Sequence, residues 1–104
     1  MNERRRSPRV SVDMHVVIHF EDAREVSDGQ ALDISRHGAF LRTATPVLLG
    51  TTIHLELDIG EERVAARCRV VRIIAPESGR SGIGVEFVEM SEQARIRLAQ
   101  LAKD

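Results

Sequence analysis

Apolar and polar residues alternate along most of this chain, and this pattern constrains its fold more than any other feature. The alternation is clearest over residues 52–59, where every second side chain is apolar. Side chains of a strand point in turn to its two faces, so a period of two is typical of a strand with one buried face. Residues 52–59 are therefore predicted to form a strand.

Segments of the same kind on both sides predict further strands. These segments cover residues 10–20, 30–34, 39–42, 63–74 and 83–87. Within the longest segment, the residues that share one face are Val64, Ala66, Cys68, Val70 and, if the strand is regular, Arg72. The predicted strands therefore number about six.

Turn signals separate the predicted strands. Residues 21–29 are polar and end in Asp28-Gly29, a dipeptide typical of turns. Residues 35–38 are predicted to form a tight turn, and Gly60-Glu61 a hairpin turn. Loops are expected over residues 46–50 and 76–82.

The end of the chain predicts a helix that runs to about Ala102. Ser91 can cap its N-terminus, and Glu92 would stabilise the positive end of the helix. The apolar stripe of this helix comprises Ala94, Leu98, Leu101 and Ala102.

Several short strands and one helix in 104 residues favour a small antiparallel β-barrel. The helix must bury its apolar stripe, and an end or a seam of the barrel is the natural place for it. A chain of this length is expected to form one domain. Cys68, on a strand, is predicted to be a small core residue and not a nucleophile.

Charge and cysteine content exclude several classes of protein. A net charge of -1 argues against a protein that coats nucleic acid, which needs a basic domain. The one cysteine allows neither an intramolecular disulfide nor a cysteine zinc cluster. Because no apolar run is long enough to span a membrane and none follows the basic N-terminus, we expect a cytoplasmic protein without membrane insertion.

Arginines crowd together near the N-terminus, at Arg4, Arg5, Arg6 and Arg9. The surrounding residues are polar and include Pro8, so they cannot bury enough apolar surface to order themselves. We therefore predict a flexible basic arm over residues 1–9 and a folded domain over residues 10–104. Taken alone, such an arm is usually a solvated tail.

A second marked segment is Asp33-Ile34-Ser35-Arg36-His37-Gly38. Arginine binds phosphate and guanine through paired hydrogen bonds, and a carboxylate and a hydroxyl on a tight turn supply acceptors. Together the two segments predict a binder of a phosphorylated, guanine-containing ligand. Taken alone, the second segment could be only a turn, with an Asx-type bond from Asp33 and a positive φ at Gly38.

The segment Arg5-Arg6-Ser7-Pro8-Arg9 is an Arg-x-x-x-Arg motif, and the second segment is an Asp-x-Ser-x-x-Gly motif. With the strand pattern, this pair resembles the PilZ domain family, bacterial receptors for the second messenger cyclic di-GMP. The resemblance covers essentially the whole chain, including residues 82–87, which look like the family's last barrel strand. It implies a six-stranded antiparallel β-barrel with a C-terminal helix, and a stand-alone receptor that is not an enzyme.

The resemblance also implies a role for the motif residues. Arg5 and Arg9 would grip phosphate and the O6/N7 edge of guanine. Asp33 would accept hydrogen bonds from the guanine N1/N2 edge, because an ionised carboxylate is an acceptor only. Ser35 would hydrogen-bond base or phosphate, and Gly38 would allow a backbone bend that a Cβ disfavours.

Two further arginines belong to the predicted site. Arg4 precedes the motif, and the resemblance suggests that it helps decide whether one ligand or an intercalated pair binds. Arg6 lies inside the motif and could stack or stay solvated. We expect no cofactor besides the ligand cyclic di-GMP, and no metal, because the four histidines are scattered.

The arm suggests a mechanism. Ligand phosphates held between arm and barrel would neutralise the arginines and order the arm, which is a disorder-to-order switch. The effect would then pass through a downstream partner protein that the sequence does not identify. We expect the receptor itself to be a monomer or a weak dimer.

Two other functions stay open at this point. One is a PilZ-like adaptor that acts by protein contact without nucleotide, although such relatives typically lack the arginine motif. The other is a small barrel that binds RNA through the arm, against which the near-neutral charge and the absence of Tyr and Trp both count. A hydrolase triad of Asp33, Ser35 and His37 is disfavoured, because these residues would stand in a row without a nucleophile elbow.

Overall fold

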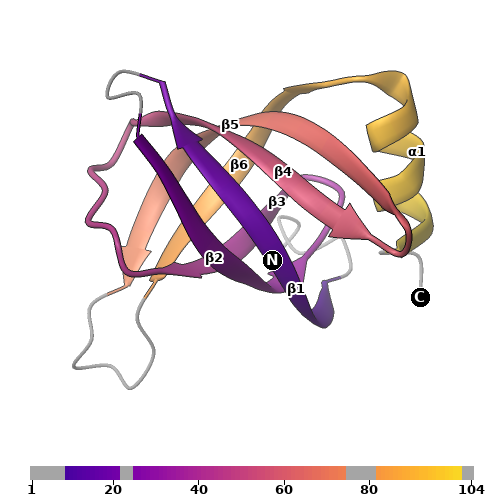
Figure 1. The fold of residues 1–104 in the computed structure, drawn as a ribbon, viewed down its shortest axis with the longest axis horizontal. Helices are drawn as coiled ribbons and strands as arrows, with labels where there is room; N and C mark the ends of the chain where they lie inside the picture. Colours follow the sequence, from indigo (N-terminus) through magenta and orange to yellow (C-terminus); the bar gives the residue numbers. More distant parts are fainter. Residues whose placement is uncertain (1–8, 22–24, 75–81, 102–104) are drawn as a thin grey trace, which may run out of the picture.

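The structure is a computed structural model, and it describes residues 9–21, 25–74 and 82–101. Six antiparallel strands close into a barrel in the order β1-β2-β3-β6-β5-β4, and a helix follows them (Figure 1). The elements are β1 (Val10–Phe20), β2 (Glu25–Ile34), β3 (Gly38–Thr43), β4 (Thr52–Ile59), β5 (Glu62–Ile74), β6 (Gly82–Met90) and α1 (Glu92–Leu101). The predicted fold class is confirmed.

Strand β1 closes the barrel, because it pairs with β2 along one edge and with β4 along the other. The ladder to β4 runs from Val16 opposite Leu57 to Phe20 opposite Ile53. Over Val16–Phe20, β1 therefore has a strand partner on both edges, which is what closes the sheet into a barrel.

The core lies inside the barrel and is built from the inward face of every strand. On β4 the residues at 0% exposure are Ile53, Leu55 and Leu57, so the alternation over residues 52–59 correctly predicted both the strand and its buried face. Cys68 is also fully buried, and burial raises the pKa of its thiol to about 12. It is a core residue, as predicted.

Strand β5 departs from the predicted alternation at one point. Val64, Cys68 and Val70 are buried as expected, but Arg72 is exposed. The register with β6 shifts between Val70 and Arg72, and this irregularity turns the arginine away from the interior. The suggestion that Arg72 shares the buried face is therefore wrong.

The turn predicted at Asp28-Gly29 is also wrong. Strand β2 already begins at Glu25, and the two residues pair with Val17 and Val16 inside the β1–β2 ladder. A Cβ on Gly29 would lie 2.7 Å from the backbone oxygen of Arg42 on β3. The glycine therefore permits a close approach of two strands and does not mark a turn.

The predicted turn at Gly60 is present, with a φ of 63° between β4 and β5. The helix also begins where expected: the hydroxyl of Ser91 accepts a hydrogen bond of 3.1 Å from the backbone N–H of Ala94. Ala94 and Leu98 are buried and Leu101 is half-buried, whereas Ala102 lies outside the described residues. Helix α1 thus covers one end of the barrel (Figure 1).

An ion pair joins the helix to the barrel. The Arg97 guanidinium donates a hydrogen bond of 2.7 Å from Nε to Glu62, the first residue of β5. This bond lowers the pKa of Glu62 and raises that of Arg97.

The outer face of the barrel carries histidines paired with carboxylates. His15 lies 3.1 Å from a carboxylate oxygen of Asp28 and 3.3 Å from one of Asp58. Hydrogen bonds to Asp28 first, and then to Asp58, raise the pKa of His15 above 6.5. His19 lies on the same strand and contacts Glu56 at 3.2 Å.

We expect Leu55→Ala to lower the free energy of unfolding by about 3 kcal/mol, because a fully buried leucine leaves a cavity in the barrel. Leu48→Ala is the matched control, since this leucine is 77% exposed and should change stability by less than about 0.5 kcal/mol. Urea denaturation monitored by circular dichroism measures both. Equal effects of the two substitutions would contradict the assignment of the core.

We expect His15 to titrate above 6.5 in the folded protein, as measured by NMR of its ring protons. Because its folded pKa is raised, its contribution to stability is complete below the unfolded value of about 6.5 and is lost as pH rises through the folded pKa. The double variant Asp28→Asn, Asp58→Asn should return the midpoint toward the unfolded value. An unchanged midpoint in that variant would rule out the two carboxylates as the cause.

Candidate ligand-binding site

The β1–β2 ladder brings the two sequence motifs together. Ser11 lies opposite Asp33 in this ladder, and Arg9 immediately precedes β1. Arg9 Nη1 forms an ion pair with Asp33 Oδ1, although the two residues are 24 positions apart in the chain. The last arginine of the first motif thus contacts the first residue of the second.

This ion pair is accessible to solvent. The side chain of Arg9 is 50% exposed and that of Asp33 is 23% exposed. Ion pairs in such surroundings contribute only about 0–1 kcal/mol, because water competes for both charges. A ligand that offers each partner a better contact could therefore separate them at little cost. The alternative in which Asp33 serves only an Asx-type turn is not what the structure shows.

Ser35 organises the turn between β2 and β3. It is 4% exposed, and its hydroxyl oxygen accepts hydrogen bonds from the backbone N–H groups of His37 and Gly38, at 3.1 and 3.3 Å. Its own backbone N–H donates to the Gly38 oxygen at 2.9 Å. The structure therefore gives Ser35 a structural role, and its contact with a ligand stays a prediction.

Gly38 begins β3 and lies against β6. A Cβ at this position would lie 2.1 Å from the backbone oxygen of Val85. Within the described residues the glycines with positive φ are Gly50 and Gly60, so the expectation of a positive φ at Gly38 is wrong. Its small size is needed for close approach of two backbones, and the neighbouring His37 oxygen accepts a hydrogen bond of 2.8 Å from the N–H of Phe87.

The rest of the predicted site lies outside the described residues. Arg4, Arg5 and Arg6 belong to this group, as does the arm up to residue 8. Among the residues that the structure does describe, Arg9 and Asp33 meet directly. Ser35 and Gly38 hold the turn that follows.

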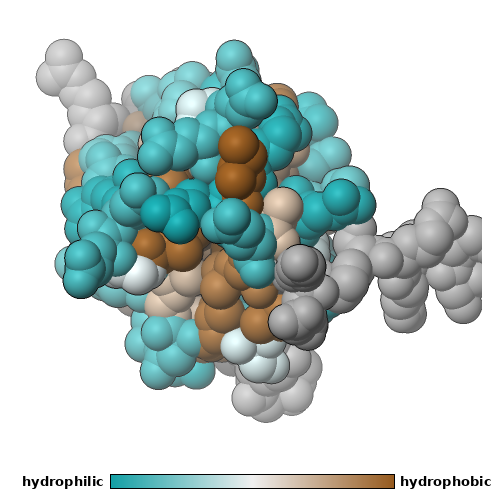
Figure 2. All heavy atoms as spheres, turned by 90° about the vertical axis from the view of Figure 1, so that its right-hand side faces the viewer, coloured by the Kyte–Doolittle hydropathy of each residue, from teal (hydrophilic) through white to brown (hydrophobic). Residues whose placement is uncertain are grey.

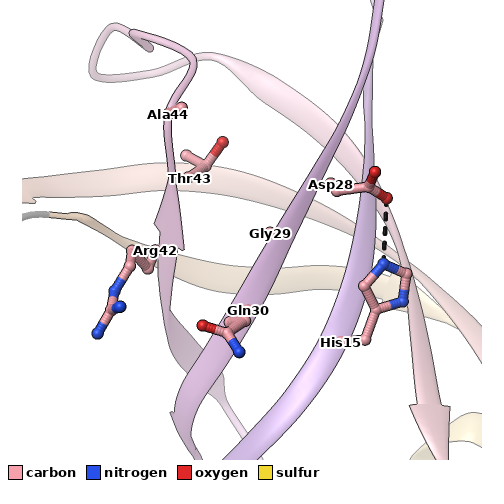
Figure 3. A pocket seen from close by; sticks show the side chains of 7 residues that line it. All are labelled: His15, Asp28, Gly29, Gln30, Arg42, Thr43 and Ala44. Atoms are coloured by element: carbon pink, nitrogen blue, oxygen red, sulfur yellow. Dashed lines mark hydrogen bonds and ion pairs between the residues drawn. The ribbon is translucent and has the colours of Figure 1, made fainter.

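A shallow hollow beside this site was not predicted. It has a volume of about 480 Å³ and lies on the outer side of β1, β2 and β3, where Gln30 and Arg42 pair across strands (Figure 3). His15 and Asp28, joined by their hydrogen bond, border it. The alternation of apolar and polar residues could have predicted that Gln30 lies on the outer face. It could not have predicted that Gln30 lies opposite Arg42, because that depends on the register of β2 with β3.

The described residues hold neither a metal cluster nor a membrane-spanning helix. No group of three or more His, Cys, Asp or Glu residues is placed to hold a metal ion within the described ranges. Nor does any helix in the same part of the chain have the length and apolar character needed to cross a membrane.

The family model of the PilZ domain matches residues 3–104. The chain belongs to the PilZ domain family. PilZ domains are regulatory binding domains and not enzymes. The comparison with curated proteins gives no match.

Solved structures support the fold of this PilZ domain. The inhibitor of motility MotI/DgrA of Bacillus subtilis has a TM-score of 0.82 and 19% identity, covering 98% of this chain and 50% of that chain. The PilZ domain of CeSA from a cellulose-synthesizing bacterium has a TM-score of 0.71 and 18% identity, covering 91% of this chain and 94% of that chain. The PilZ domain of YcgR from Escherichia coli, solved with c-di-GMP, has a TM-score of 0.73 and 17% identity, covering 97% of this chain and 90% of that chain. This PilZ domain thus spans about half the length of the Bacillus protein.

We expect Gly38→Ala to lower the free energy of unfolding by about 2–3 kcal/mol, because its Cβ would overlap the backbone of β6. Gly84→Ala is the matched control. Its Cβ would come no closer than 3.4 Å to atoms of the flexible Arg72 side chain, so we expect it to be tolerated. Thermal unfolding of both variants makes the comparison. If Gly38→Ala is as stable as Gly84→Ala, the close contact of β3 with β6 is not as described.

Proposed function

We propose that this PilZ domain is a receptor for cyclic di-GMP that signals, without catalysis, through a partner protein. The observation that carries the proposal is the contact between Arg9 and Asp33, which joins the two motifs at one end of the β1–β2 ladder. Membership of the PilZ family supports it. So does the PilZ domain of YcgR, a structure of the same fold solved with c-di-GMP.

The chemistry of the pair suits an exchange of partners. A ligand phosphate can replace the Asp33 carboxylate as the anion that Arg9 binds. The N1/N2 edge of a guanine can replace the arginine as the donor to Asp33. Because the existing ion pair is exposed and weak, both replacements could occur in one binding event.

The turn would keep Asp33 in place during this exchange. Ser35 and Gly38 fix the backbone immediately after the carboxylate through the buried hydroxyl and the close contact with β6. A site that is held in advance loses less entropy when a ligand binds. We propose that Ser35 also faces base or phosphate when the ligand is bound.

The arm would supply the remaining cations. In this proposal Arg5 grips the second phosphate or guanine edge. Arg4 helps decide whether one ligand or an intercalated pair binds, and Arg6 stacks on the ligand or stays solvated. Ligand binding would order residues 1–9 against the barrel and create a new surface for the partner.

Calorimetric titration with cyclic di-GMP tests the proposal. Wild-type protein should give saturable binding, and Arg9→Ala and Asp33→Asn should each weaken it about 10-fold or more, the effect of one charge-assisted hydrogen bond. Arg69→Ala removes an exposed arginine whose ion pair with Glu86 is long, at 3.8 Å, and should bind as wild type does. Cyclic di-AMP, which lacks the guanine edge, should bind much more weakly.

An absence of binding at tens of micromolar ligand, with the fold intact, would favour the adaptor that acts by protein contact alone. Equal loss in Arg69→Ala would point to general charge attraction in place of a site. Ordering of the arm is tested separately by amide exchange: protection of residues 1–9 should rise on addition of ligand, and equal protection in both states would refute the switch.

A further inference from the structure

A groove lies between the motif turn and the helix. It has a volume of about 410 Å³, and its wall on the turn side is formed by Arg36 and His37. On the helix side it is lined by Arg95, Ile96, Leu98 and Ala99, and Met90 closes it at the end of β6. We call this the turn–helix groove.

The floor of the groove is apolar. Ile96 is 51% exposed, although the helix buries its other apolar residues Ala94 and Leu98 in the core. Arg95 and Ile96 are exposed, so the barrel does not cover this side of α1. Apolar side chains are visible among hydrophilic ones on the end of the molecule where α1 lies (Figure 2).

The rim of the groove is cationic. Arg36 and Arg95 are both exposed, and neither forms an ion pair with any described residue. By contrast, Arg63, Arg67 and Arg97 each contact a carboxylate at 3.2 Å or less. The charge on the rim is therefore available to an outside anion.

We propose that the turn–helix groove binds an acidic, amphipathic helical segment of a partner protein. Apolar side chains of that segment would pack on Ile96 and Met90, and its carboxylates would pair with Arg36 and Arg95. This arrangement of a buried apolar anchor with charges at the rim is typical of helix-in-groove recognition.

Other occupants fit the groove less well. A second copy of this chain could offer the exposed carboxylates of Glu61 and Glu92, but its own helix α1 would also bring another Arg95 toward the cationic rim. A nucleic acid would use the cations but would leave the exposed Ile96 without a partner. A partner segment that carries both carboxylates and apolar side chains satisfies both halves of the groove.

The groove is joined to the candidate ligand site through the chain itself. Arg36 and His37 lie between Ser35 and Gly38, the two residues that fix the motif turn. Cyclic di-GMP bound at Asp33 would therefore change the affinity of the groove for its segment, a statement that rests on the proposed function. Docking without ligand does not depend on it.

The test uses the whole protein and a synthetic helical peptide of about 18 residues, long enough for several helical turns. Leucines at positions i, i+3, i+4 and i+7 would form one face and glutamates the other. A second peptide carries Lys for each Glu, and a third has the same composition as the first in scrambled order. Binding is followed by NMR of the ¹⁵N-labelled protein.

We expect the Glu peptide to shift the amides of Arg36, Arg95 and Ile96 with a Kd below about 1 mM. The Lys and scrambled peptides should bind at least about 10-fold more weakly, because the Lys peptide lacks the carboxylates and the scrambled peptide lacks a continuous apolar face. Arg95→Glu and Ile96→Ser should each weaken binding by a similar factor. Arg72→Glu makes the same charge change in an exposed residue of β5 that does not line the groove, and should have no effect.

Several outcomes would overturn the proposal. One is the absence of amide shifts at millimolar peptide, or shifts confined to residues outside the groove. Another is equal binding of the scrambled peptide. Amide shifts that depend on protein concentration alone would indicate self-association. Repeating the titration with cyclic di-GMP tests only the coupling. An unchanged peptide Kd at saturating ligand would refute the coupling and leave docking established, whereas failure of ligand binding itself is read from calorimetry.

Discussion

The pairing of β1 with both β2 and β4 is the constraint on which the rest of the molecule depends. It closes the barrel, and closure decides which face of each strand becomes core, as Val16, Ile18 and Leu57 show at 0% exposure. The same ladder sets the register that brings Arg9 beside Asp33. One set of backbone hydrogen bonds thus builds the scaffold and assembles the candidate site.

Rigid and exchangeable parts alternate within the second motif. Ser35 and Gly38 are bound up in the turn and in the contact with β6, so they fix the backbone. Asp33, which precedes them, holds only a weak and solvent-exposed ion pair, and Arg36, which lies between them, holds none with a described residue. A short turn can therefore hold its shape while its charged side chains change partners, which is what a receptor that reports ligand to a partner requires.

Local patterns predicted most of the fold. The alternation over residues 52–59 gave both strand and buried face because burial on one side imposes a period of two, and Ser91 marked the helix start because its hydroxyl caps Ala94. The prediction failed at Asp28-Gly29, where contact with a distant strand outweighed a local turn signal. Likewise the ion pair of Arg9 and the turn–helix groove join segments far apart in the chain, so no local pattern reveals them.

Arg9 and Asp33 are proposed to give up their mutual ion pair when each binds the ligand. The most direct measurement is NMR of the Arg9 side-chain N–H and the Asp33 carboxyl carbon during titration with cyclic di-GMP. Both signals should move together and saturate with a single Kd, while the amide of the buried Leu57 stays in place. Saturable binding that leaves the Arg9 and Asp33 signals unmoved would place the ligand elsewhere and rule out the exchange of partners.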